Sequence, residues 1–311
     1  MKKIILLIGS GNIGFRHFQG LLSSSHKLEI NIFDKNQDSY EKLKIFLKKN
    51  KTNKKINFLK NLNKNKKIDL LILATNSKDR LKILRKVCKL STIKNILFEK
   101  IVFINNSSFK EACKIQKTNG FNAWVNCIRR EIPIFNLIKS KIKKDLIKIS
   151  YKGNNWGMGS NSIHFIDLFY YLKKIKRINT FAKIKKIIPS KRFGFSELIG
   201  KIQLIDVEGN ELFLEDSTKY NSNKLIIKFS DQNYTFVKSN IIHKKKNLIL
   251  SSGEKINENV SKITKIFTNK LFSKNKINLT TLKETQLYHN IFFKIVNSYT
   301  KKNNLKKKYF T

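Results

Sequence analysis

The chain is poor in the residues that cross-link or stiffen a fold. Its 311 residues include three cysteines, two prolines and two methionines. Cys88, Cys113 and Cys127 form no C-x-x-C pair, so neither a disulfide framework nor a zinc site is expected. This cysteine usage is typical of a reducing compartment, and we expect a cytoplasmic protein without a bound metal.

Long apolar runs are also missing. The apolar segment 4–8 is too short for a secretion signal, and it ends in glycines rather than at a cleavage site. No stretch approaches the roughly 20 apolar residues that span a bilayer. The sequence therefore predicts neither export nor a membrane partner.

Acidic residues are heavily outnumbered. The 21 Asp and Glu stand against 65 Lys and Arg, which gives a formal charge of +44. Only seven of the basic residues are Arg and 58 are Lys, whereas phosphate and base recognition favours the planar fork of Arg. Since Asn, Ile and Phe are also frequent while Pro and Met are scarce, the composition is typical of A/T-rich coding. We interpret the charge as a solvated lysine surface that attracts anionic ligands, with a nucleic-acid face as the weaker alternative.

The most informative segment is the glycine-rich turn after the first apolar run. The strand-like segment 4–8 leads directly into G-x-G-x-x-G and the start of a helix. The first glycine permits the tight turn, the second lets a pyrophosphate approach the backbone, and the third allows close helix–strand packing. We therefore expect a dinucleotide, bound at the helix N-terminus by Gly9, Gly11, Asn12, Ile13 and Gly14.

An acidic residue follows at the distance that a dinucleotide site requires. The strand-like run 28–33 ends on Asp34, twenty residues after Gly14. A carboxylate there accepts hydrogen bonds from the adenosine ribose and repels a 2′-phosphate, which favours NAD. Lys35 and the lysine surface weaken that preference and keep NADP open. The alternative interpretation is a glycine-rich turn with a helix-capping Asp.

The order of the predicted elements indicates two domains. Strands and helices alternate through residues 1–120, which predicts a Rossmann domain with a doubly wound parallel sheet. Residues 121–311 predict an α+β domain with a mostly antiparallel sheet, which would hold substrate and form oligomer contacts. Its predicted elements are strands at 121–126 and 146–151, several strands between Thr180 and Lys238, and helices after Pro133, at 162–173 and at 280–301.

Two strand ends carry polar groups. Thr75 and Asn76 follow the fourth strand, where ligands of an open parallel sheet bind, so they are candidates for the nicotinamide half of the cofactor. Helix capping by Asn76 or Ser77 is the alternative. Glu99 and Lys100 follow the fifth strand, and an ammonium there could stabilise the developing charge on a substrate oxygen.

A further candidate pair lies in the second domain. A glycine-rich loop enters a predicted helix that carries His164 and Asp167, and the i, i+3 spacing places both on one face. A histidine suits proton transfer near neutral pH, and a carboxylate can orient it. A buried histidine bonded to its neighbour is the alternative. We expect no metal, because no third ligand is evident.

Together these segments resemble the glucose–fructose oxidoreductase/inositol dehydrogenase (Gfo/Idh/MocA) family. The matching features are the glycine fingerprint followed by Arg16-His17, the turn at 74–77, the Glu99-Lys100 pair, and the His and Asp three residues apart on a helix. The resemblance covers most of the chain and is strongest over residues 4–170. It implies a homo-oligomeric oxidoreductase acting on a sugar or nucleotide-sugar.

The resemblance also implies roles for individual residues. His164 would take the proton of a substrate hydroxyl, Lys100 would polarise that oxygen, and Asp167 would hold the site or bind substrate. Glu99 would contribute to the cofactor site. Arg130 would face the substrate, as would Trp156, whose surroundings are similar to those in members linked to bacterial surface-sugar synthesis.

Three positions depart from the family pattern. Ile101 replaces the proline after Glu-Lys, and Ser160 and Ser162 replace an Asp and a Gly that often precede the histidine. A carboxylate that could bind substrate is thereby missing. Two further hypotheses therefore stay open, a dinucleotide-binding sensor or partner subunit without turnover, and a nucleic-acid-binding protein.

Overall fold

The structure is a computed structural model that describes every residue except 63–64, 238–239, 246–247 and 256–258. The chain divides into two compact units. The first consists of Met1–Ile128 and Asn259–Gln286, and the second of Arg129–Glu258 and Leu287–Thr311.

A six-stranded parallel sheet forms the centre of the first unit. Its order is β3-β2-β1-β5-β7-β8, the doubly wound arrangement that the sequence predicts. Strand bounds are β1 Lys3–Ile8, β2 Leu28–Phe33, β3 Lys55–Leu59, β5 Leu70–Leu73, β7 Asn95–Phe98 and β8 Asn122–Val125. A separate pair comprises β4 (Asn65–Ile68) and β6 (Ser91–Ile93).

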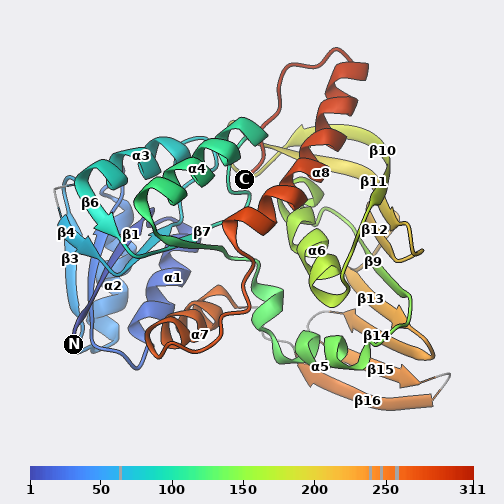
Figure 1. Cartoon of the computed structure of the whole chain (residues 1–311), viewed down its shortest axis with the longest axis horizontal. Helices are drawn as coiled ribbons and strands as arrows, with labels where there is room; N and C mark the ends of the chain where they lie inside the picture. Colours follow the sequence, from blue (N-terminus) through green and yellow to red (C-terminus); the bar gives the residue numbers. More distant parts are fainter. Residues whose placement is uncertain (63–64, 238–239, 246–247, 256–258) are drawn as a thin grey trace. The chain divides into compact units, whose positions relative to one another are not determined.

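Helices cover both faces of this sheet (Figure 1). On one face, α1, α2 and α7 pack through Phe18, Leu43 and Phe267 against the apolar side chains of the central strands. The other face carries α3 and α4, which contact each other. Helix bounds are α1 Asn12–Leu22, α2 Ser39–Lys49, α3 Arg80–Leu90, α4 Asn106–Asn119 and α7 Val260–Phe272.

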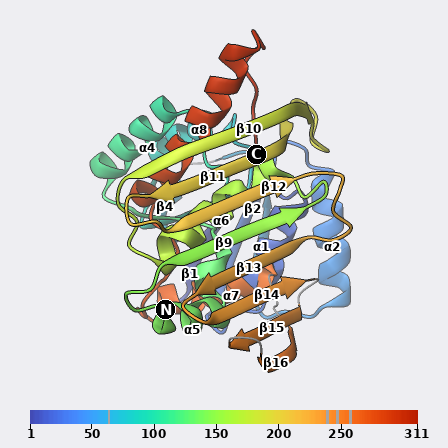
Figure 2. The same ribbon diagram turned by 90° about the vertical axis from the view of Figure 1, so that its right-hand side faces the viewer.

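The second unit is built on a mostly antiparallel sheet, as predicted. Over its described residues the strand order is β10-β11-β12-β9-β13-β14-β15-β16, and only the β12–β9 pair is parallel (Figure 2). Strand bounds are β9 Ile147–Gly153, β10 Ile178–Pro189, β11 Ser196–Asp206, β12 Glu211–Asp216, β13 Lys224–Phe229, β14 Gln232–Val237, β15 Asn240–Lys245 and β16 Leu248–Lys255. Lys238, the end of the last predicted strand, lies outside the described residues.

Three helices and a short turn complete the chain. Helix α6 (Met158–Leu172) packs against β11 and β12, and α5 (Pro133–Lys141) packs against α6. A 3-10 turn spans Ile128–Glu131. Helix α8 (Leu282–Lys302) begins in the first unit and continues in the second.

The predicted boundary after residue 120 differs from the division in the structure. The predicted strand 121–126 is β8, which pairs with β7 and extends the parallel sheet. The segment 259–286 also belongs to the first unit, where the Val125 amide donates to the Thr280 carbonyl oxygen at 2.9 Å. Helix α7 approaches α1 so closely that a Cβ on Gly20 would lie 2.4 Å from the Ser261 carbonyl oxygen. Local sequence patterns carry no signal for this return, because its contacts join segments far apart in the chain.

Phe267 tests whether α7 is part of the first core. Its side chain is fully buried, and its ring lies 5.6 Å from that of Trp124. We expect Phe267→Ala to lower the free energy of unfolding by about 3–5 kcal/mol in urea titrations, because it leaves a large cavity. The control Phe193→Ala removes an exposed ring and should change it by less than about 0.5 kcal/mol. A Phe267→Ala protein as stable as the control would contradict the assignment of α7 to this core.

Candidate functional site

The glycine loop after β1 has the geometry of a phosphate cradle. Gly9 adopts a φ of +95°, and a Cβ there would lie 2.8 Å from the carbonyl carbon of Ala74. A Cβ on Gly14 would lie 1.8 Å from the Gly9 carbonyl oxygen, so α1 packs directly on the loop. A Cβ on Gly11, in contrast, would meet no atom within 4 Å. Open space therefore lies over Gly11, at the helix N-terminus where the first amides lack intrahelical acceptors.

Asp34 holds this loop in place. Its Oδ2 accepts hydrogen bonds from the Ser10 amide at 2.6 Å and from the Ser10 hydroxyl at 3.1 Å. Its Oδ1 accepts one from the Asn36 amide at 3.0 Å. Lys42 on α2 places its ammonium 3.2 Å from the side-chain oxygen of Asn12, the first residue of α1. A carboxylate and an ammonium therefore both lie beside the loop.

In the turn after β5, Asn76 bonds to the backbone of the turn itself, whereas the Thr75 hydroxyl does not. Asn76 Oδ1 accepts hydrogen bonds from the amides of Lys78 at 2.9 Å and Asp79 at 3.1 Å, so Asn76 shapes the entry to α3. The N-cap of α3 is Asp79, so the predicted alternative with Asn76 or Ser77 as the N-cap is wrong. The Thr75 hydroxyl is buried and has no hydrogen-bond partner within the described part of the chain. It is the group of this turn that a cofactor could engage.

Glu99 lies in a buried network that the sequence motifs do not reveal. Its carboxylate faces His17 Nε2 at 2.9 Å, and Asn126 Nδ2 donates to the same oxygen. The other ring nitrogen of His17, Nδ1, lies 2.8 Å from the Thr264 hydroxyl. Burial alone would raise the pKa of Glu99, but hydrogen bonding and charge from His17, the Asn126 amide and the charge of Lys100 together lower it. Glu99 is thus placed to position the turn after β7 rather than to contact a cofactor from the surface.

Two residues of this region were not predicted from the sequence. His17 is fully buried, and its signal was the Arg-His pair that follows the third glycine. Arg80 is also buried, and it belongs to none of the sequence motifs. Lys100 itself is half-buried, and its peptide bond to Ile101 is cis.

In the second unit, Asp167 forms an ion pair with Arg130. Arg130 Nε donates to Asp167 Oδ2 at 3.0 Å, and its NH2 lies 2.8 Å from Oδ1. Arg130 NH2 also donates to the Tyr288 hydroxyl at 2.9 Å. Arg130 and Asp167 are both buried. The placement of the Arg130 side chain therefore favours a structural ion pair with Asp167 over the expected contact with substrate. His164 lies half-buried on the same helix, α6.

Trp156 is a packing residue rather than part of an open surface. Its ring is buried against Tyr151 and Phe165, and its Nε1 donates to the Glu215 carbonyl oxygen at 2.9 Å. Its backbone amide donates to the buried carboxylate of Asp216, whose pKa is raised by burial. The expected contact with substrate is therefore not supported by the placement of this side chain.

The two serines at the start of α6 also have internal partners. The Ser160 amide donates to Glu197 Oε2 on β11 at 2.9 Å. The Ser162 hydroxyl is buried and bonded to the Met158 carbonyl oxygen. A carboxylate is therefore present at the beginning of α6, but it is that of Glu197 on β11.

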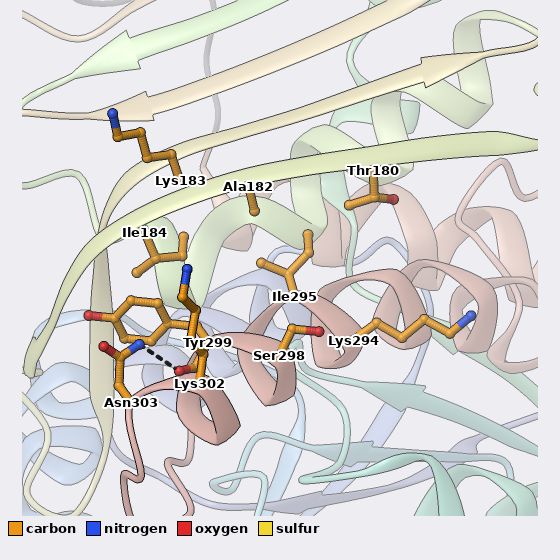
Figure 3. A pocket seen from close by; sticks show the side chains of 10 residues that line it. All are labelled: Thr180, Ala182, Lys183, Ile184, Lys294, Ile295, Ser298, Tyr299, Lys302 and Asn303. Atoms are coloured by element: carbon orange, nitrogen blue, oxygen red, sulfur yellow. Dashed lines mark hydrogen bonds between the residues drawn. The ribbon is translucent and has the colours of Figure 1, made fainter.

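A groove of about 510 Å³ lies between β10 and the C-terminal half of α8 (Figure 3). Lys183, Lys294 and Lys302 line it, but the amino groups of Lys183 and Lys294 lie at opposite ends of the view. None of the predicted site residues lines this groove. It therefore plays no part in the candidate site.

Metal clusters and membrane-spanning helices are both absent from the described residues. These residues contain no group of three His, Cys, Asp or Glu side chains that could hold a metal ion. No helix in the described ranges combines the length and the apolar character needed to cross a membrane.

Comparisons with known proteins identify the fold. No protein-family model matches the chain, and no curated protein matches it in sequence. An oxidoreductase from Agrobacterium radiobacter, solved in complex with NAD+, L-tartaric acid and magnesium, is 12% identical, with 96% of each chain covered and a TM-score of 0.73. UDP-N-acetylglucosamine 3-dehydrogenase GnnA from Acidithiobacillus ferrooxidans is 9% identical, with 95% of this chain and 96% of that chain covered and a TM-score of 0.72. The super-repressor mutant of Gal80p from Saccharomyces cerevisiae is 13% identical, with 96% of each chain covered and a TM-score of 0.70. The chain has the fold of these proteins, as the family resemblance predicts.

Two glycine variants separate the packing role of the loop from its binding role. Gly14→Ala forces a methyl group into the backbone of Gly9 and should cost about 1–3 kcal/mol of stability without any ligand. Gly11→Ala adds a methyl group in open space and should change stability by less than about 0.5 kcal/mol. We expect Gly11→Ala to weaken NADH binding at least tenfold, roughly 1.4 kcal/mol, because the methyl group occupies the approach to the loop.

The two properties are measured by thermal unfolding of the free protein and by fluorescence titration with NADH. A Gly11→Ala protein that binds NADH as tightly as the parent would contradict the placement of the pyrophosphate over Gly11.

Proposed function

We propose that this protein is an NAD(P)-dependent oxidoreductase of the Gfo/Idh/MocA family. It transfers hydride between the nicotinamide and a secondary alcohol or ketone of a sugar or sugar derivative. The observation that carries the proposal is the open space over Gly11 at the N-terminus of α1, next to Ser10, whose amide and hydroxyl donate to Asp34. Thr75, whose hydroxyl has no hydrogen-bond partner among the described residues, follows on the same side of the loop, since a Cβ on Gly9 would lie 3.0 Å from its backbone nitrogen. These groups fit a dinucleotide, because they combine a phosphate cradle with a ribose acceptor and a hydrogen-bonding hydroxyl.

In the proposed mechanism, two side chains act on the reacting hydroxyl group of the substrate, one on its proton and one on its oxygen. A bound oxidised nicotinamide would serve as the acceptor of the hydride from the carbinol carbon. His164 takes the hydroxyl proton on its imidazole and returns it in the reverse direction. Lys100 donates a hydrogen bond to the same oxygen and stabilises its developing negative charge. Asp167 acts through Arg130, whose guanidinium it holds, rather than as a proton carrier.

The cofactor form follows from the surroundings of Asp34. Its carboxylate at the end of β2 disfavours a 2′-phosphate, which supports NAD. Lys35 and Lys42 lie nearby and reduce that repulsion, so NADP remains the second form to test.

The substrate class rests on the family resemblance and on the fold shared with GnnA, a UDP-N-acetylglucosamine 3-dehydrogenase. We propose a sugar or nucleotide-sugar of bacterial surface-sugar synthesis, processed in the cytoplasm by a homo-oligomer. The lysine-rich surface favours an anionic substrate.

A second candidate is a dinucleotide-binding sensor or partner subunit without turnover. The buried Ser162 hydroxyl is bonded within α6, so this position offers no side-chain group to a ligand. Gal80p, whose super-repressor mutant is among the similar structures, shares the fold. Cofactor binding without hydride transfer to any sugar or nucleotide-sugar would favour this candidate.

The first experiment is a fluorescence titration with NADH and, separately, with NADPH at near-physiological salt. We expect saturable binding with Kd in the micromolar range, about −8 kcal/mol, and NADH preferred. Binding that disappears with modest salt would indicate charge alone and would overturn the proposal.

Lys100 provides the test of the chemistry. We expect Lys100→Ala to lower kcat more than tenfold, about 1.4 kcal/mol of transition-state stabilisation, because the ammonium no longer stabilises the developing oxyanion. NADH affinity should stay within about threefold of the parent, since the role is assigned to the chemical step. Turnover is followed as NADH absorbance with sugars and UDP-N-acetylglucosamine. Lys110→Ala, which removes an exposed lysine of α4, is the matched control. An unchanged kcat would remove Lys100 from the mechanism.

A further inference from the structure

A buried arginine holds the backbone on which Lys100 is carried. Arg80 is the first residue of α3, and its side chain is only 1% exposed. Its NH1, which carries two hydrogens, lies within hydrogen-bond distance of three carbonyl oxygens, those of Glu99 at 2.7 Å, Ile101 at 2.5 Å and Val102 at 2.7 Å. Its NH2 donates to the carbonyl oxygen of Thr75. One guanidinium thus joins the turn after β5, which carries Thr75 and Asn76, to the turn after β7, which carries Glu99 and Lys100.

The contacts of Arg80 provide hydrogen-bond donors for backbone carbonyl groups that follow β7. After Phe98 the chain leaves β7, so the following buried carbonyl groups can no longer pair within the sheet. A buried carbonyl group without a hydrogen-bond donor costs free energy, and a buried guanidinium without acceptors costs more. The contacts of Arg80 give these carbonyl groups a donor and give both terminal nitrogens of the guanidinium acceptors. A lysine could not replace it, because the three N–H groups of an ammonium share one nitrogen, whereas Arg80 reaches the two turns through two separate nitrogens.

We propose that Arg80 is a positioning residue that fixes the direction of the Lys100 side chain. Lys100 lies between Glu99 and Ile101, and Arg80 binds the carbonyl groups of both neighbours. The backbone on either side of Lys100 is therefore held by one side chain. The catalytic importance of this position rests on the proposed function, whereas the restraint on Lys100 does not.

The restraint is measured without any substrate, by brief acetic anhydride labelling of the folded protein. Mass spectrometry then gives the labelling rate of each lysine as a function of pH. We expect Arg80→Lys to change the rate at Lys100 at least about threefold while most other lysines keep theirs, because only the turns after β5 and β7 lose donors. Arg80→Gln, which buries no charge, is the second variant in case Arg80→Lys unfolds. Arg85→Lys on the same helix is the control, since Arg85 is exposed and pairs with Glu111.

A double-mutant cycle with Lys100→Ala connects the restraint to catalysis. UDP-N-acetylglucosamine with NAD+ is the first assay, followed by any substrate found among sugars. We expect Arg80→Lys to lower kcat about tenfold or more with NADH affinity nearly unchanged, and to have little further effect in the Lys100→Ala background.

The outcomes separate this inference from the proposed function. Unchanged Lys100 labelling in a folded Arg80 variant would overturn the inference, and so would additive effects of the two substitutions on kcat. Altered labelling together with a Lys100→Ala enzyme of normal kcat would sustain the restraint and refute the proposed function of Lys100.

Discussion

The first unit depends on one buried carboxylate. Glu99 lies after β7, and its partners His17 and Asn126 come from α1 and from the end of β8. Through His17 the network also reaches Thr264 on α7. A buried charge that loses its partners costs several kcal/mol, so these segments must all be in place for Glu99 to remain ionised in the interior. The turn that carries Lys100 is therefore fixed by segments that are separated by up to 247 residues along the chain.

Local pattern was enough to predict much of the fold. Apolar runs of four to six residues, each followed by a polar turn and an amphipathic helix, identify the parallel sheet because a strand buried on both faces needs a continuous apolar sequence. The glycine spacing located the loop and helix α1, since only glycine tolerates the contacts of Gly9 and Gly14. The return of α7 to the first unit was missed because its contacts with α1 are determined by tertiary packing. Strands β15 and β16 were missed as well, in a lysine-rich part of the chain with weak alternation.

The candidate site shows the same division. Lys100, Thr75 and Asp34 follow the ends of parallel strands, as predicted, and their roles in the site stay predictions that rest on residue type and on this position. The partner of Asp167 could not be predicted in the same way. Helical spacing placed Asp167 on the face of His164, but the carboxylate pairs with Arg130, 37 residues earlier in the chain. Spacing along a helix defines which side chains share a face, whereas the partner depends on what packs against that face.

The structure shows where this lysine-rich chain uses its few arginines. Three of the seven arginines, Arg80, Arg129 and Arg130, have buried side chains. Arg80 and Arg130 use the guanidinium fork on carbonyl groups and on a carboxylate, and Arg129 lies 4.3 Å from the centre of the Phe165 ring. When base composition drives the exchange of arginine codons for lysine codons, a fork-shaped contact in the interior is where that exchange is least tolerated. In a chain with 58 lysines, the three buried arginines therefore occupy interior positions at which a lysine would lose planar contacts.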